Sequence, residues 1–217
     1  MRLVLEQELK NLKNMLFEIS RYAKESILAS IEFIMTGEKR YYDSVKMLEE
    51  KSDYLNLNIF EKCVSIIARQ QPVAKDLRFV LMSANISSFY ERICDIALEI
   101  CDLQIPWTTG CPEDVKRNII WMVKKVIAMI EINEDYLKRG EVAGIKENLE
   151  KIDDEIDELF EETMSLIVKR IEDGSIGARE GANLILMVRF IERIGDIVAK
   201  TGARIYYIEK GKHVWIK

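Results

Sequence analysis

The sequence predicts an all-α protein: two tandem three-helix bundles related by internal duplication, with six long helices in all. Three observations support this class. Only 3 prolines and 10 glycines occur among the 217 residues, which favours long uninterrupted helices. Apolar residues recur at alternating spacings of four and three, the seam of a helix packed in a bundle, and no β-alternation of useful length is present. A motif in the first half returns in the second at an offset of 101 residues.

The first half supplies three of the helices, expected at residues 3–36, about 38–70 and about 73–104. The seam of the first helix alternates spacings of four and three, through Leu5, Leu9, Leu12, Leu16, Ile19 and Ala23. Gly37 is expected to end this helix. Pro72 fixes φ and suits the opening turn of the third helix, and Pro106 is expected to end that helix.

After a link at residues 107–111, the second half supplies helices expected at about 113–139, 142–171 and 178–208. Pro112 followed by Glu113 and Asp114 is typical of a helix start, because proline suits the first turn and acidic residues favour the positive end of the helix dipole. The four-three spacing returns in Val115, Ile119, Met122, Val126 and Met129. The chain is therefore expected to divide into one domain over residues 1–106 and a second over residues 107–217.

The repeated motif is F-x-E-R-I-x-D-I, at residues 89–96 and 190–197. Its Glu and Asp are four residues apart, so both lie on one face of a helix. The second helix of each half carries a further E-x-x-x-D pair at the same offset. The four pairs are Glu49 and Asp53, Glu91 and Asp95, Glu150 and Asp154, and Glu192 and Asp196. Like charges placed in this way repel each other by about 0.2–0.5 kcal/mol, a repulsion that a cation between them would remove.

These eight carboxylates are candidate metal ligands. If the second and third helices of a half are antiparallel neighbours, two pairs face one another. Oxygen ligands without histidine or thiolate suit hard cations such as Mg²⁺, Ca²⁺, Mn²⁺ or iron. Asn56 and Asp157 occupy equivalent positions one turn further along, and both can supply oxygen. The alternative is a solvated acidic surface held by ion pairs, such as one between Arg189 and Glu192.

Composition argues against several other classes of protein. The net charge of −5 and the lack of a dense basic cluster disfavour nucleic-acid binding. The uncharged runs fall short of the roughly 18 residues that a membrane span needs, and the charged N-terminus is unlike a signal peptide. His213 is the only histidine, so neither a ferritin-type di-iron site nor a histidine-activated nucleophile can be assembled, and no catalytic residue is assigned. Four cysteines are expected to be small core residues in a reducing cytosol: Cys63, Cys94, Cys101 and Cys111.

The motifs resemble those of the PhoU family of bacterial phosphate-signalling regulators. The resemblance rests on the two E-R-I-x-D motifs and on A-R-Q-Q-P-V-A-K-D-L-R at residues 68–78, which is similar to the stretch that this family places before its third helix. It covers nearly the whole chain and implies a cytoplasmic negative regulator that is not an enzyme, located at the inner face of the membrane through its partners. Such a regulator links a high-affinity phosphate ABC transporter to a sensor histidine kinase and keeps phosphate-starvation genes off when phosphate is plentiful.

The resemblance also implies partners and a cofactor. The partners are a second copy in a homodimer, the transporter ATPase and the membrane sensor kinase, with no nucleic acid among them. The cofactor is a multinuclear metal cluster, of iron or alternatively Zn, Mn, Mg or Ca, on the eight carboxylates named above. The chain departs from the family pattern at Cys94, where the motif usually has glycine, and at Asn56, which lacks the charge of Asp157. We therefore expect the second half to bind metal more tightly.

Two other functions are alternatives to this regulatory role. One is a carboxylate-bridged metal enzyme on the same bundle, against which the lack of histidine ligands counts. The other is a structural bundle whose acidic residues are only solvated. Metal-dependent turnover of a substrate would favour the first, and a thermal stability that does not respond to metal would favour the second.

Overall fold

The computed structural model describes residues 2–103, 105, 107 and 110–216, and over these residues every regular element is a helix. The helices are α1 (Arg2–Thr36), α2 (Lys39–Gln70), α3 (Ala74–Asp102), α4 (Glu113–Arg139), α5 (Ile145–Glu172) and α6 (Ala178–Lys210). The predicted all-α class is confirmed, and the predicted helix bounds agree with the structure to within a few residues. Pro106, the predicted end of the third helix, lies outside the described residues. The domain boundary after residue 106 stays a prediction.

The largest difference in helix bounds occurs at α5, which begins at Ile145 and not at residue 142. Two glycines explain it. Gly140 follows α4 with a φ of 70°, and Gly144 precedes α5 with a φ of 79°. Both values lie in the left-handed region, where residues with a Cβ are disfavoured. The chain therefore makes a turn between the two glycines before it becomes helical again.

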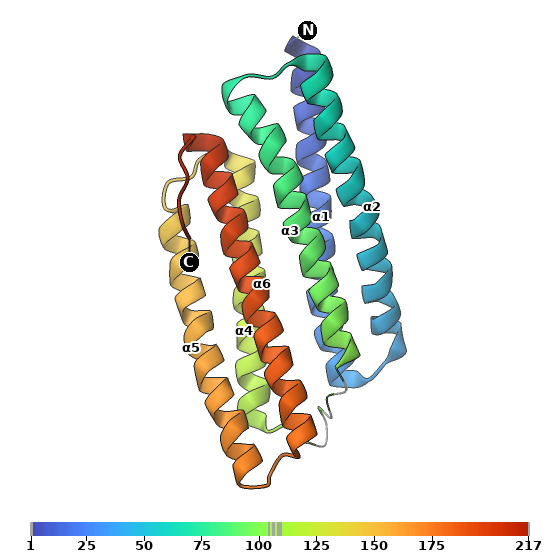
Figure 1. Ribbon diagram of the computed structural model, residues 1–217, viewed down its shortest axis with the longest axis vertical. Helices are drawn as coiled ribbons and strands as arrows, with labels where there is room; N and C mark the ends of the chain where they lie inside the picture. Colours follow the sequence, from blue (N-terminus) through green and yellow to red (C-terminus); the bar gives the residue numbers. More distant parts are fainter. Residues whose placement is uncertain (1, 104, 106, 108–109, 217) are drawn as a thin grey trace.

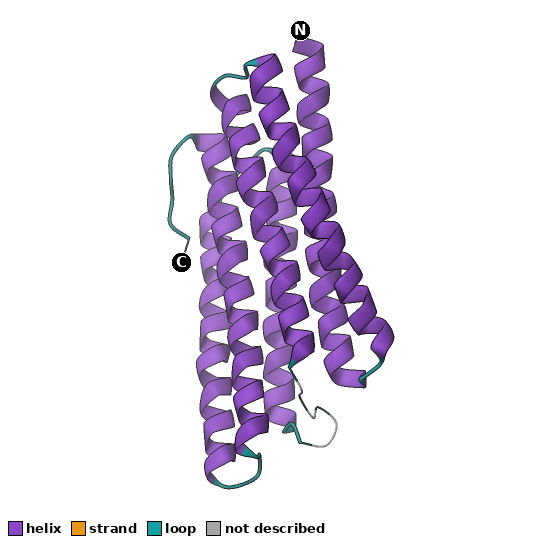
Figure 2. Ribbon diagram, turned by 45° about the vertical axis from the view of Figure 1, so that its right-hand side comes forward, coloured by secondary structure: helices purple, strands orange, loops and turns teal. Residues whose placement is uncertain are grey.

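Helices α1, α2 and α3 pack against one another as one bundle, and α4, α5 and α6 as a second. Figure 1 shows the two bundles side by side, and Figure 2 shows that all six helices follow the same long axis. Contacts between the bundles run from α3 to α6 and from α1 to α4. Each of these contacts joins a helix to its own counterpart in the other half.

One cluster of buried apolar side chains runs through both bundles. The predicted seams supply it: Leu12, Leu16 and Ile19 of α1 and Ile119 and Met122 of α4 are each at most 1% exposed. Burying a side chain of this size contributes about 1.5–3 kcal/mol relative to leaving it in water. The apolar residues are concentrated in such seams, and no helix among the described residues is apolar over a length that could cross a membrane.

Polar contacts between the bundles fix how the two halves sit along their common axis. Glu134 of α4 accepts hydrogen bonds from Ser20 Oγ at 2.6 Å and from Lys24 Nζ at 2.8 Å, both on α1. Arg204 Nε of α6 donates to Asn85 Oδ1 of α3 at 2.7 Å. These groups are partly buried, so a shift of one bundle by a helical turn would leave a charge desolvated and unpaired.

The four cysteines are free and buried, as the sequence predicts. Burial raises the pKa of the thiols of Cys63, Cys101 and Cys111 to about 12. At neutral pH these side chains are therefore thiols and not thiolates. Their burial and protonation are typical of small core residues.

Candidate metal centre

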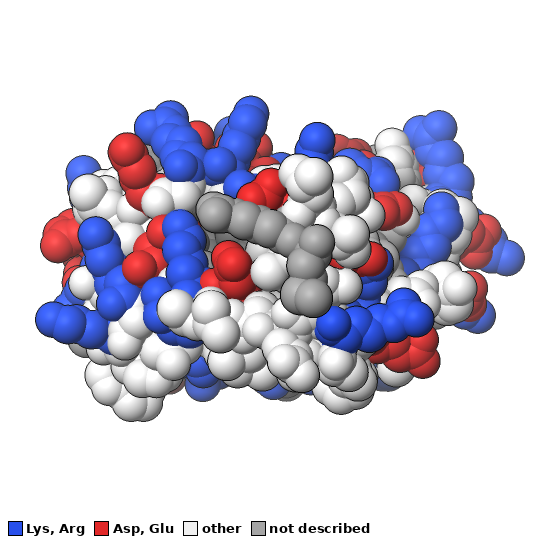
Figure 3. Space-filling view, turned by 90° about the horizontal axis from the view of Figure 1, so that it is seen from above, with Lys and Arg blue, Asp and Glu red and all other residues white. Residues whose placement is uncertain are grey.

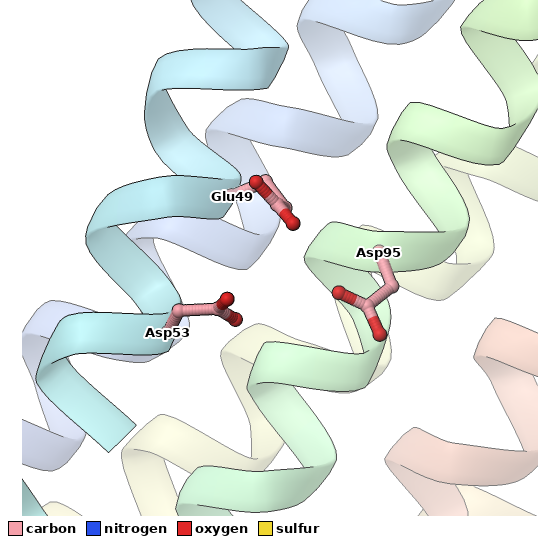
Figure 4. Close-up of side chains that lie close together, drawn as sticks. All are labelled: Glu49, Asp53 and Asp95. Carbon is pink, nitrogen blue, oxygen red and sulfur yellow. The ribbon is translucent and has the colours of Figure 1, made fainter. Parts of the chain in front are cut away.

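The predicted ligands of the first half converge between α2 and α3. These helices are antiparallel neighbours, and Figure 4 shows Glu49 and Asp53 of α2 pointing toward Asp95 of α3. One carboxylate oxygen from each of the three residues lies within 4.8 Å of the others. The face of α2 that contains Leu48 and Leu55 is buried, which leaves the two acids at the edge of the helix that faces α3 and solvent.

Glu91, the fourth predicted ligand of this half, lies one turn before Asp95 and close enough to Asp53 for the two carboxylates to affect each other's ionisation. Burial, followed by the charges of Asp95 and Asp53, raises the pKa of Glu91 to about 7. The pKa of Glu49 is raised as well, by burial and then by the charges of Asp53 and Asp95. The four carboxylates thus form one cluster, in which each negative charge disfavours the ionisation of the others.

This cluster fits a hard cation. Mg²⁺ and Ca²⁺ hold oxygen ligands at about 2.0–2.6 Å, so two oxygens up to about 5 Å apart can share one ion. The separation within 4.8 Å meets that condition for Glu49, Asp53 and Asp95. Asp53 is exposed, so an ion can reach the cluster from solvent. A cation there would favour the ionised forms of Glu49 and Glu91, whose pKa values are raised by burial and then by the neighbouring negative charges.

One basic residue already supplies positive charge to this cluster. Arg92, the arginine of the E-R-I-x-D motif, contacts Asp95 at 3.0 Å and Glu99 at 3.1 Å. It pairs with one of the four acids, while the charges of Arg92 on Glu91 and of Lys46 on Glu49 only partly offset the raised pKa values of those two carboxylates. Among the described residues, an ion pair is therefore present at Asp95 but not at Glu49, Asp53 or Glu91.

The second half is arranged differently. Three of its four predicted ligands have a basic partner one turn away: Glu150 with Lys146 at 3.6 Å, Glu192 with Arg189 at 2.8 Å and Asp196 with Lys200 at 3.6 Å. Asp154, the fourth, is exposed. Within the described residues, the convergence of three carboxylates seen in the first half has no equivalent in the second. The tighter binding expected for the second half stays a prediction.

The most buried acid of the second half is not among the ligands that motif spacing predicts. Asp153 of α5 is only 4% exposed. Burial, followed by the charges of Asp157, Asp196, Asp154 and Glu192, raises its pKa to about 7. Asp153 belongs to no E-x-x-x-D pair, but it falls on the buried seam of α5. A carboxylate at a seam position is the signal that could have identified it.

Cys94 replaces the glycine that the second half has at the equivalent position, and the residue packed beside it also differs between the two halves. In the first half the Cys94 thiol lies near the hydroxyl groups of Ser52 and Ser26 inside the bundle. Ser52 is the counterpart of Asp153, and Gly195 is the counterpart of Cys94. A Cβ at Gly195 would lie 3.3 Å from Ile156 Cδ1 and 3.8 Å from Asp153 Oδ1. The glycine thus leaves room for the buried carboxylate, whereas the first half fills this space with a thiol and a hydroxyl.

The sequence is similar to a known family of proteins. The model of the PhoU domain matches it twice, at residues 16–103 and 119–205. The chain is 33% identical to a phosphate-specific transport system accessory protein PhoU homolog from Archaeoglobus fulgidus, over 98% of each chain. It is 29% identical to PhoU homolog 1 from Thermotoga maritima, over 96% of this chain and 90% of that protein.

Solved structures share the fold. The crystal structure of the phosphate transport system regulatory protein PhoU from Streptococcus pneumoniae covers 97% of this chain and 99% of its own, with a TM-score of 0.86 and 19% identity. PhoU from Pseudomonas aeruginosa covers 95% of this chain and 99% of its own, with a TM-score of 0.79 and 18% identity. At these identities the likeness shows the architecture of two tandem bundles and not the function.

Proposed function

This chain belongs to the PhoU domain family, and from that membership we propose that it is a regulatory accessory protein of a phosphate transport system. The main support for the proposal is the match, over nearly the full length, to a protein named as a phosphate-specific transport system accessory protein. We propose further that it acts in the cytoplasm as a homodimer and a negative regulator. In this role it contacts the ATPase of a high-affinity phosphate transporter and a membrane sensor histidine kinase, and keeps phosphate-starvation genes off when phosphate is plentiful.

The acidic clusters would hold the metal in this proposal. Glu49, Asp53 and Asp95, with Glu91 beside them, have the spacing and chemistry to bind a hard divalent cation. Such an ion supplies positive charge that stabilises the ionised carboxylates and ties α2 to α3. The function of these residues is then to shape a surface for protein contact.

An exposed apolar surface lies directly beside the first-half cluster. Leu57, Phe60 and Val64 of α2 are 64%, 58% and 53% exposed. They follow Asp53 at spacings of four, three and four, so all four residues share one face of the helix. We name this surface the α2 stripe. Exposed apolar side chains gathered on one face are typical of a site for protein contact.

The second half provides an internal comparison for the α2 stripe. At the 101-residue offset, its positions are occupied by Glu158, Glu161 and Ser165 of α5. The bundle therefore does not require apolar residues at these positions. We place the contact with the transporter ATPase on the α2 stripe, where a cation held by Glu49 and Asp53 would neutralise the adjoining negative charge.

Affinity capture tests this proposal. The tagged protein, recovered from detergent extracts of its own cells with and without phosphate, is expected to bring down the transporter ATPase. Replacing Leu57→Glu and Phe60→Glu together should reduce ATPase recovery at least tenfold, because the changes place charge in an apolar contact. The matched control is Leu186→Glu, an exposed leucine on α6. Failure to recover the ATPase under any condition would contradict the proposal, and equal recovery by both variants would contradict the placement on α2.

A second prediction concerns the acids of the second half. Glu192→Ala and Asp196→Ala together are expected to raise expression from phosphate-starvation promoters in phosphate-rich medium, because they remove carboxylates needed for a metal-shaped surface. A promoter fused to a reporter gene measures the change. The control is the pair Glu161→Ala and Glu172→Ala, exposed acids on α5. Repression that persists unchanged in the first variant would exclude a regulatory role for these two acids.

A further inference from the structure

A cavity of about 310 Å³ lies between the bundles, lined by α1, α3, α4 and α6. Five basic residues line it: Lys10, Lys13, Lys75, Lys138 and Arg139. Two acids, Asp76 and Glu209, line it as well. Figure 3 views the molecule from above, the end at which the cavity lies, and shows Lys and Arg side chains interspersed with Asp and Glu side chains on this face. In a chain with a net charge of −5, this cavity is a local region of positive potential.

Ion pairs account for only part of the positive charge. Lys75 pairs with Glu209, and Arg139 pairs with Asp135, which does not line the cavity. Lys13 Nζ donates to the carbonyl oxygen of Lys138 at 3.2 Å. Burial lowers the pKa of Lys13, and the charge of Lys75 lowers it further against the opposing effect of Glu209.

The remaining basic residues have fewer partners. Among the described residues, neither Lys10 nor Lys138 takes part in an ion pair. Three ammonium groups, those of Lys10, Lys13 and Lys138, therefore share the cavity with one remaining carboxylate, that of Asp76. The wall has a surplus of two positive charges, which matches the charge of a phosphate dianion.

Helix dipoles do not explain the whole arrangement. Basic residues in the last turn of a helix offset its negative end, which accounts for Lys138 and Arg139 at the end of α4. Lys75, in contrast, stands in the first turn of α3, where a positive charge is unfavourable. Lys10 lies inside α1 and near neither end of it. The helix dipole therefore does not account for the positions of Lys10 and Lys75.

We propose that this cavity binds a phosphate-bearing small molecule, with its phosphate group held by Lys10, Lys13 and Lys138. The other part of the wall is apolar and consists of Leu9, Phe79, Leu137 and Ile208. Cavities of about 300 Å³ and above hold small organic ligands, so a bare phosphate ion would leave much of this one to water. The ring of Phe79 offers a surface on which a nucleobase can stack. The ligand is therefore a small phosphate ester with an apolar or aromatic portion, and free phosphate is the other source of the same group.

The cavity is separate from the carboxylate cluster. Lys75 and Asp95 are 20 residues apart on α3, which corresponds to about 30 Å along the helix. The cavity is also built from both bundles, so its ligand would tie α1 and α3 to α4 and α6. The proposal rests on this cavity alone and does not depend on the regulatory function proposed above.

Isothermal titration of the full-length protein, in a phosphate-free buffer with EDTA, tests the proposal with three probes: inorganic phosphate, AMP and adenosine. We expect AMP to bind at one site per chain and adenosine not to bind. Lys13→Met and Lys138→Met together should weaken AMP binding at least tenfold. Phe79→Leu should weaken AMP severalfold without affecting phosphate. The matched control, Lys39→Met with Lys169→Met, removes two exposed lysines elsewhere and should leave the affinity unchanged.

The outcomes separate the two sources of the phosphate group. AMP binding that is tighter than phosphate binding supports a phosphate ester, and equal affinities that both fall in the lysine variant support free phosphate. Thermal melting of each variant establishes that it is folded. The proposal is overturned if neither phosphate compound binds, if adenosine binds as tightly as AMP, or if the folded lysine variant binds both compounds as the unmodified protein does.

Discussion

Mn²⁺ or Fe²⁺ added to the metal-free protein is expected to raise its Tm, and the pair Glu49→Gln and Asp53→Asn is expected to abolish most of that rise. A cation that binds only the folded protein, at about 100 times its dissociation constant, adds about 2.7 kcal/mol to the free energy of unfolding. For a chain of this size that corresponds to a rise in Tm of about 5–10 °C. Both residues lie in the three-carboxylate cluster, and neither takes part in an ion pair among the described residues.

The affinity of the double variant for metal is expected to fall at least 100-fold, because two of the three converging oxygens become neutral amides. Titration of metal into the chelator-treated protein, followed by calorimetry, measures the change. Without metal the variant should be no less stable than the unmodified protein, since the substitutions remove like-charge repulsion. The same titration of a variant with Asp153→Asn and Asp196→Asn shows which of the two halves binds metal more tightly. An unchanged affinity in the first variant would show that this cluster is not the metal site.

Raising the pH from about 5 to about 8 is expected to destabilise the metal-free protein, and Asp153→Asn is expected to remove much of this dependence. The folded pKa of Asp153 is about 7, raised from the ordinary value of 3.8. Between these values the folded protein retains a proton that the unfolded chain has lost. The stability from this group is therefore fully present below about pH 4 and is lost as the pH rises through about 7.

The pH effect of Asp153 is on the order of 2 kcal/mol, about half of what its pKa shift alone would give, since two of the four neighbouring acids, Asp154 and Asp157, are exposed and screened. Denaturant unfolding at several pH values measures it. Glu91, with a folded pKa of about 7, contributes in the same direction, so some dependence on pH should persist in the variant. The matched control is Asp154→Asn, because Asp154 is adjacent but exposed. An equal pH dependence in the Asp153 variant and the control would contradict the burial of an uncompensated carboxylate at Asp153.

The helices and their grouping could be predicted because they depend on local pattern. The spacing of Leu12, Leu16 and Ile19 specifies a buried seam whatever that seam packs against. The offset of 101 residues shows that the second half repeats the first, so one bundle predicts the other. The start of α5 was misplaced because Gly144 adopts a positive φ after a turn that apolar spacing does not register.

The candidate site could be predicted only in part. Motif spacing identifies acids on one helix face, but the face that points inward depends on how the helices pack. That is why Asp153, next to the predicted Asp154, was missed although it is the buried one. The basic cavity could not be predicted at all, because Lys10, Lys75 and Lys138 come from three helices of two bundles. Their proximity arises from the packing of α1 on α4 and of α3 on α6.

That packing also indicates how the duplicated chain began. Because each half contacts the other through the same helices, the contact is isologous, like that of a twofold symmetric dimer. A single three-helix ancestor would have exposed the apolar side of its third helix, which dimerisation would have covered. In the single chain this pairing is intramolecular and independent of protein concentration. Because the two halves are joined but not identical, equivalent helices can differ: α2 has the exposed apolar residues Leu57, Phe60 and Val64, whereas α5 has Glu158, Glu161 and Ser165 at the same positions.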